Sequence, residues 1–146
     1  MHGQAWQWNG PLGEEPSVAA VRVAHAVEMG PPGLQGWCAE WPSVLEPAAL
    51  QFAAGAAGLL AGCDPLLLLA SATDGSGGDV GALIDGESCA RMTAAGFDPD
   101  TEVRLGNCRE LLGSAGDLIS VSAAGSPALS TPLLILGLKW HAPAGD

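Results

Sequence analysis

The chain has 146 residues, of which 48% are hydrophobic, and its 16 acidic and 5 basic residues give a net charge of −11. This length suits one domain with enough apolar side chains for a core. The acidic excess argues against direct binding of nucleic acid, which needs Lys and Arg at the phosphates, and against adsorption to anionic membranes.

Residues 1–16 predict an extended N-terminal arm, because they contain turn formers and no periodic apolar pattern. No basic region followed by an apolar segment marks a signal peptide here, and Gly, Asp and Pro interrupt the most apolar window, residues 48–72. We therefore expect a soluble protein made in a cytosol. Trp6 and Trp8 have the i, i+2 spacing that puts both rings on one side of an extended strand.

Residues 17–146 are predicted to form a single β-rich domain, in which residues 17–62 are a candidate Trp-rich subdomain. The valines of Ser17–Met29 slightly favour a strand, and a short helix capped by Ser17 is the alternative. Trp37 and Trp41 fit one helical turn or a loop packed on the core. Glu46–Ala54 is the best helix candidate, with Pro47 near its first turn, and a strand is its alternative.

From Leu66 onward the sequence is a series of short apolar runs separated by turn residues, such as Asp85-Gly86 and Gly106-Asn107. Turn signals every 10 to 15 residues or so are typical of an all-β protein. The pattern predicts a small antiparallel β-barrel or sandwich with an extended N-terminal arm and at most one short helix. The runs are Leu66–Ala70, Val80–Ile84, Val103–Leu105, Cys108–Leu112, Leu118–Ser122 and Leu133–Leu136.

The sequence offers no catalytic constellation. Its 3 histidines form no metal-binding pattern, and its 4 cysteines form no C-x-x-C pair, so we expect reduced, partly buried thiols. Acidic residues surround the Gly-rich segment Gly75–Gly78 without the order of a calcium loop, and no Lys follows it as in a phosphate loop. These acids are Asp74, Asp79, Asp85 and Glu87. We predict that the chain is not an enzyme and holds no cofactor or metal.

Four of the 5 tryptophans lie in the first 41 residues. They can pack as a small N-terminal core cluster, or they can contact a partner, since Trp is favoured at interface hot spots. The candidate partner-binding residues are Trp6, Trp8, Trp37 and Trp41.

Half of the chain resembles the β-rich domains of tailed-phage capsid decoration proteins, also called cement or head-stabilising proteins. Three segments carry the resemblance, namely Val80–Asp85, Ala95–Asn107 and Ala128–Leu136. Cys108-Arg109-Glu110 departs from the family pattern, in which Gly and small residues are usual, and the Trp-rich N-terminal third has no counterpart.

The resemblance implies a non-enzymatic virion structural protein, commonly a homotrimer, that binds the outer surface of a phage capsid. Its partner would be the major capsid protein, and it would reinforce contacts between capsid subunits after synthesis in the host cytoplasm. The alternatives are a head or tail fibre base protein, or a β domain that binds a small ligand or carbohydrate. An N-terminal arm of the predicted kind can also add a strand to the edge of a partner's sheet.

Overall fold

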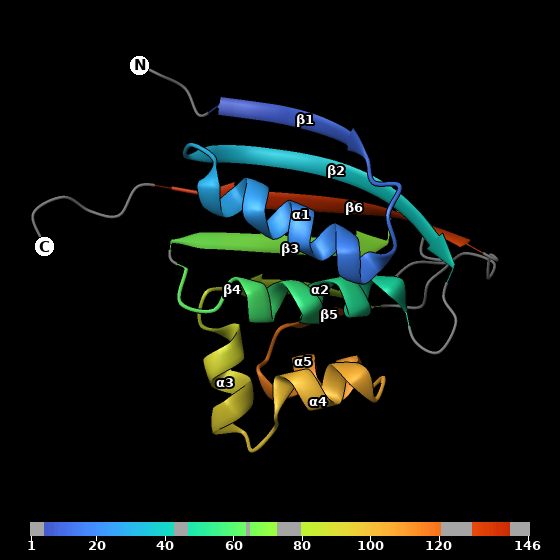
Figure 1. Cartoon of the computed structure of the whole chain (residues 1–146), viewed down its shortest axis with the longest axis vertical. Coiled ribbons are helices and arrows are strands. Elements are labelled where there is room, and N and C mark those ends of the chain that lie inside the picture. Colours follow the sequence, from blue (N-terminus) through green and yellow to red (C-terminus); the bar gives the residue numbers. More distant parts are fainter. Residues whose placement is uncertain (1–4, 43–46, 64, 73–79, 121–129, 141–146) are drawn as a thin grey trace, which may run out of the picture.

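A mixed six-stranded sheet organises the chain in the computed structural model, which describes residues 5–42, 47–63, 65–72, 80–120 and 130–140 (Figure 1). The strands are β1 (Ala5–Pro11), β2 (Gly33–Pro42), β3 (Leu66–Ala72), β4 (Val80–Asp85), β5 (Leu118–Ser120) and β6 (Ser130–Lys139). The helices of the described residues are α1 (Pro16–Met29), α2 (Ala48–Leu59), α3 (Ser88–Ala94), α4 (Pro99–Arg104) and α5 (Cys108–Ser114).

The strands follow the order β1-β2-β6-β3-β4-β5 across the sheet. β1 pairs in parallel with β2, and α1 makes the connection between them. β6 lies between β2 and β3 and is antiparallel to both, so β2 and β3 run in the same direction with α2 between them in the chain. Part of the predicted arm, Ala5–Pro11, is thus the edge strand of this sheet.

The predicted all-β fold is wrong, because helices occupy several of the apolar runs that indicated strands. Residues 17–29 form most of α1, with Pro16 in its first turn, where the fixed φ of proline suits a helix. Its buried residues recur at three- and four-residue intervals, which is the helical period. They are Ala19, Ala20, Val23, Ala24 and Val27.

The two predicted hairpin turns lead into helices instead. Gly106-Asn107 joins α4 to α5, with Gly106 at a φ of 78° and the Asn107 side chain donating to the Glu102 carboxylate at 3.0 Å. Asp85-Gly86 leads from β4 into α3, where the Ser88 hydroxyl accepts a hydrogen bond from the Asp85 backbone N–H. The runs 103–105 and 108–112 therefore belong mainly to α4 and α5, not to strands.

Other predicted elements are confirmed. The runs beginning at Leu66, Val80, Leu118 and Leu133 lie in β3, β4, β5 and β6. The helix expected over residues 46–54 is α2, although it continues through two glycines to Leu59. Within the described residues, no helix is both long and apolar enough to cross a membrane.

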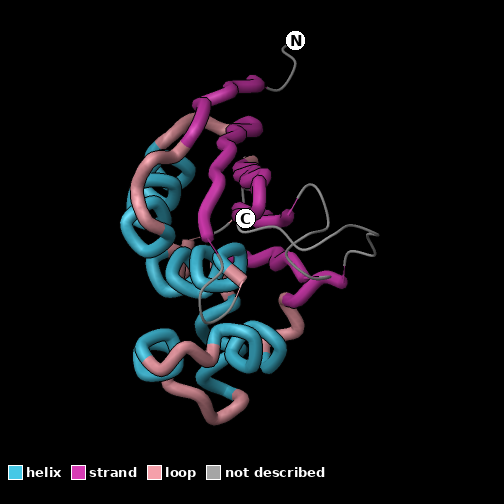
Figure 2. Tube along the Cα trace, turned by 90° about the vertical axis from the view of Figure 1, so that its right-hand side faces the viewer, coloured by secondary structure: helices cyan, strands magenta, loops and turns pink. Residues whose placement is uncertain are grey.

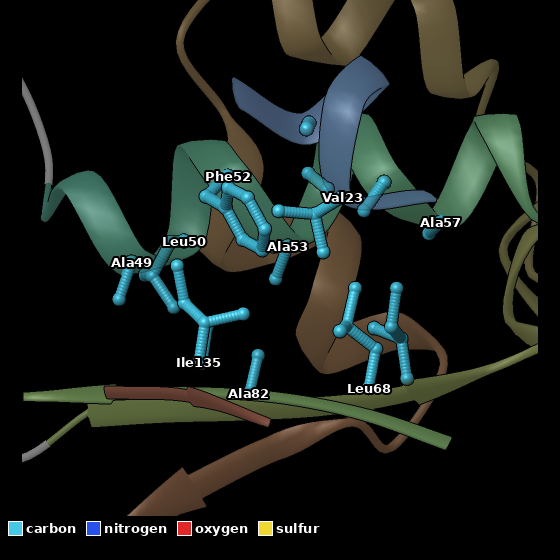
Figure 3. Close-up of a cluster of buried hydrophobic side chains, with 14 of the residues drawn as sticks. Val23, Ala49, Leu50, Phe52, Ala53, Ala57, Leu68, Ala82 and Ile135 are labelled. Atoms are coloured by element: carbon cyan, nitrogen blue, oxygen red, sulfur yellow. The ribbon is translucent and has the colours of Figure 1, made fainter. Parts of the chain in front are cut away.

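α1 and α2 pack side by side on one face of the sheet (Figures 1 and 2). Buried side chains from both layers meet there, with Val23 and Phe52 of the helices above Leu68 and Ile135 of the strands (Figure 3). α3, α4 and α5 lie beyond α2, near β4 and β5. The core therefore occupies one side of the sheet only.

α1 approaches β6 closely at Gly137. A Cβ atom there would lie 2.5 Å from Cγ2 of Val27, well inside contact distance. We expect Gly137→Ala to lower the free energy of unfolding by about 1–3 kcal/mol, the usual cost of overpacking. Gly58→Ala is the control, because a Cβ at Gly58 meets nothing within 4 Å. It should raise stability by about 0.5–1 kcal/mol, since alanine favours a helix more than glycine.

Urea unfolding followed by circular dichroism measures both changes. Adding Val27→Ala to the Gly137→Ala chain removes the clashing methyl groups, so the cost of Gly137→Ala should be smaller in that background. An equal cost in both backgrounds would contradict the close approach of α1 to β6.

Candidate binding surface

The second face of the sheet is apolar and carries none of the described helices (Figure 2). Side chains alternate along each strand, so residues neighbouring the buried positions of β2, β3 and β6 point to this second face. Six partly exposed leucines occupy those positions, and the strand register places them side by side. We call this surface the open face; its leucines are Leu34, Leu67, Leu69, Leu134, Leu136 and Leu138, and the exposed Leu83 of β4, which pairs with Leu69, adjoins them.

Trp6 and Trp8 extend the open face across β1. They pair with Leu34 and Gly36 of β2, and both rings lie over Gly36, where an added Cβ would meet Trp8 at 2.9 Å and Trp6 at 3.2 Å. Trp6 is 57% exposed and Trp8 50% exposed. The prediction that these two rings share one side of a strand is confirmed, and both are accessible to a partner.

Trp37 and Trp41 point to the opposite, helix-covered face. Both are buried, and the Trp41 ring stacks on Phe52 of α2 at a centroid distance of 5.9 Å. The Trp41 indole N–H also donates to the backbone oxygen of Glu14 at 2.7 Å, which ties β2 to the start of α1. The four candidate tryptophans therefore divide into a core pair and a surface pair, and whether any of them contacts a partner stays a prediction.

A hollow of about 430 Å³ lies at the carboxyl ends of β1 and β2. The register of these strands shifts between Trp8 and Pro11, and Pro11 pairs with Cys38. Cys38 and Glu40 line the hollow together with apolar side chains, among them Leu134 of the open face. Its lining suits an apolar group more than a charged ligand.

Two further hollows of about 430 and 360 Å³ meet on the helix side, between α2 and α4. They share Gly55, Val103 and Arg104. Arg104 is their one basic side chain, and its guanidinium bonds to the backbone oxygen of Asp100 and the hydroxyl of Thr101 in its own helix. The groove thus contains one cationic side chain, which already has hydrogen-bond partners in its own helix, and small residues line its base.

The buried Asp117 makes the densest polar cluster among the described residues. Its Oδ1 accepts from Nη2 of Arg91 at 2.8 Å, and Arg91 also contacts Asp85, Ser88 and the backbone oxygen of Ala115. Burial works to lower the pKa of Arg91, but the hydrogen bond and charge of Asp117, with Asp85, outweigh it and raise the pKa. The cluster joins α3 to the ends of β4 and α5 and serves as a structural clamp.

The described residues contain no group of three His, Cys, Asp or Glu side chains placed to hold a metal ion. Cys38, Cys63, Cys89 and Cys108 form no disulfide. His25 is exposed on α1. Asp74, Asp79 and Gly75–Gly78, which we compared with a calcium loop and a phosphate loop, lie outside the described residues.

The leucines of the open face carry a sequence signal that the strand prediction left unused. Leu66–Leu69 and Leu133–Leu136 are continuous apolar runs, not alternating ones. A continuous run is typical of a strand buried on both faces, whereas alternation indicates one face in water. In the described structure only one face of β3 and β6 is covered by helices, so these runs mark the other face as a candidate interface.

Comparison with known proteins places the fold. Neither a family model nor a curated protein matches the sequence. Among solved structures, the chain is similar to glycerate kinase from Thermotoga maritima, with a TM-score of 0.80 and 21% identity over 94% of this chain and 37% of that one. It is also similar to the PH0495 protein from Pyrococcus horikoshii, with a TM-score of 0.75 and 17% identity over 94% of this chain and 35% of that one.

These likenesses show the fold alone, an α/β architecture, and agree with the correction of the all-β prediction. The chain spans little more than a third of the length of each of these proteins.

Tryptophan fluorescence tests the division of the rings. In the double variant Trp6→Phe, Trp8→Phe, we expect acrylamide to quench a much smaller share of the emission, because the core tryptophans are shielded and of the rest only Trp140 is exposed. Trp37→Phe is the matched control and should leave the quenchable emission nearly unchanged. A larger quenching loss in the Trp37 variant would contradict the assignment of faces.

The clamp at Asp117 predicts unequal costs for its two carboxylates. The Asp117 side chain is 6% exposed and that of Asp85 is 31% exposed. Asp117→Ala should lower the free energy of unfolding by roughly 2–4 kcal/mol, because it leaves the Arg91 guanidinium without its buried partner. Asp85→Ala should cost about 1 kcal/mol or less. Urea unfolding distinguishes the two, and equal costs would refute the clamp.

Proposed function

We propose that this chain is one domain of a larger, two-part phosphotransferase that acts on glycerate or a related small hydroxy acid. In this proposal the chain docks through the open face and does not form a complete active site by itself. The supporting comparison is the likeness of 94% of the chain to 37% of a protein named glycerate kinase. In that protein the corresponding fold is accompanied by a much longer stretch of chain.

The observation that carries the docking role is the open face itself. Burying apolar surface stabilises by roughly 25 cal/mol per Å², so a sheet face of leucine and tryptophan gains from a cover. Continuous leucine runs such as those of β3 and β6 are typical of strands that are covered on both faces. An exposed apolar patch of this kind marks an interaction surface more often than a free one.

Three of the five basic side chains support a shared active site. Phosphoryl transfer needs cations around the transferring phosphate. Arg22 pairs with Glu14 at 3.0 Å, and Arg91 is held in the clamp with Asp117. Lys139 donates to the backbone oxygens of Glu28 and Gly30 at the end of α1. These three cations have structural partners, so the second part of the enzyme would supply most of the groups that bind phosphate.

The capsid decoration function, with its homotrimer, its capsid partner and its virion location, stays a prediction. The all-β fold on which it was based is wrong. Exposed Trp6 and Trp8 still favour contact with some partner. The prediction that the chain is not an enzyme likewise stays open, since the proposal allows catalysis only in company with a second part.

Recovery of the tagged chain from its native cells tests the function. We expect the purified assembly to form ADP from ATP and Mg²⁺ in a glycerate-dependent manner, while the isolated chain gives only the background rate. An assembly that shows no glycerate dependence would overturn the proposed reaction. An isolated chain as active as the assembly would overturn the shared active site.

A further inference from the structure

We infer that the open face is covered by amphipathic helices of the second part, with leucine-like residues toward the sheet and Lys or Arg along their flanks. This inference rests on the proposed function and adds the chemistry of the partner. Two features of the described residues carry it, the shape of the face and the distribution of charge around it.

The size of the open face suits helices. The open face runs across β1, β2, β6, β3 and β4, and a spacing of about 4.8 Å between strands gives it a width of roughly 20–25 Å, which two helices about 10 Å across can cover. α1 and α2 already cover the other face in this way (Figure 1). A helical cover on the open face would produce a sheet with helices on both faces, which is a common α/β arrangement.

The surface shape of the open face would determine how a layer of helices packs on it. The half-exposed rings of Trp6 and Trp8 lie over Gly36 of β2, and Gly81 on β4 presents no side chain. The hollow beside Cys38 and Leu134 can accept one large apolar side chain from the partner. The exposed rings and the hollow would together set the register of the partner, because pockets and aromatic anchors dominate interface energies.

Charge decides between a helical partner and a second copy of this chain. Lys139 is the one basic residue within the described strands, and its side chain reaches the carbonyl groups at the end of α1, not the open face. Glu40 occupies an open-face position of β2, whereas Asp85 of β4 is already paired with Arg91 in the clamp. A second copy would oppose one net charge of −11 to another, whereas basic flanks complement it.

Two synthetic helical peptides of roughly 20 residues, long enough to form helix, serve as probes. Both carry leucine along one face; the polar face is lysine in one peptide and glutamate in the other. We expect the full chain to bind the lysine peptide and not the glutamate peptide. Binding should shift the emission of Trp6 and Trp8 to shorter wavelength, and this shift should be absent from the Trp6→Phe, Trp8→Phe variant.

Paired surface variants locate the binding. The double variant Leu83→Ser, Trp8→Ser changes two exposed residues of the open face, of which Leu83 is 38% exposed. It should lower the affinity for the lysine peptide by about tenfold or more. Leu105→Ser with Val21→Ser is the matched control on the helix side, where both residues are exposed, and it should bind like the wild type. Circular dichroism confirms that each variant is folded.

Each other outcome overturns the inference. Equal binding of the two peptides would show that charge does not select the partner. An equal loss of affinity in the two variant pairs would show that the peptide does not bind at the open face. A dimer in light scattering that Trp8→Ser and Leu83→Ser dissociate would assign the face to a second copy. Glycerate-dependent ADP formation by the native assembly is a separate readout, so the proposed function can fail while the peptide result stands, and the reverse.

Discussion

The leucine runs of the two central strands constrain the rest of the molecule. β3 and β6 are apolar on both faces, so a helical layer on one side buries only half of their side chains. α1 and α2 form that layer with small residues and can lie close to the sheet, as the contact between Val27 and Gly137 shows. In the described structure, helices therefore cover one face of the sheet and leave the other face without a helical layer.

The strands from Leu66 onward could be predicted from sequence better than the helices, but β2 could not, since the interpretation of Trp37 and Trp41 as a helical turn or a loop was wrong. Leu66–Ala70 and Leu133–Leu136 are recognisable from composition alone, because leucine runs bounded by turn residues are typical of buried strands. Ser17–Met29 was ambiguous, since its valines favour a strand while its alanines favour a helix, and packing of the alanine side against α2 decides the outcome. The short α4 and α5 lack a full periodic pattern, so local spacing could not separate them from hairpin strands.

The candidate surface was predictable in part. The i, i+2 spacing placed Trp6 and Trp8 on one side of a strand, and the structure agrees. No local pattern could place Trp37 and Trp41 on the opposite face, because that depends on the strand order β1-β2-β6 and on the position of α2. The open face arises from five strands that are spread over the sequence, and only their register brings the leucines together.

The acidic balance of the chain follows from the same constraint. A domain with an apolar sheet face that none of its described helices covers is at risk of self-association, because exposed apolar patches promote it. A net charge of −11 opposes that association while leaving attraction to a basic partner intact. In the proposed docking, charge and apolar surface have separate roles: the leucines would supply the binding energy, and the acidic residues would favour the approach of basic partners.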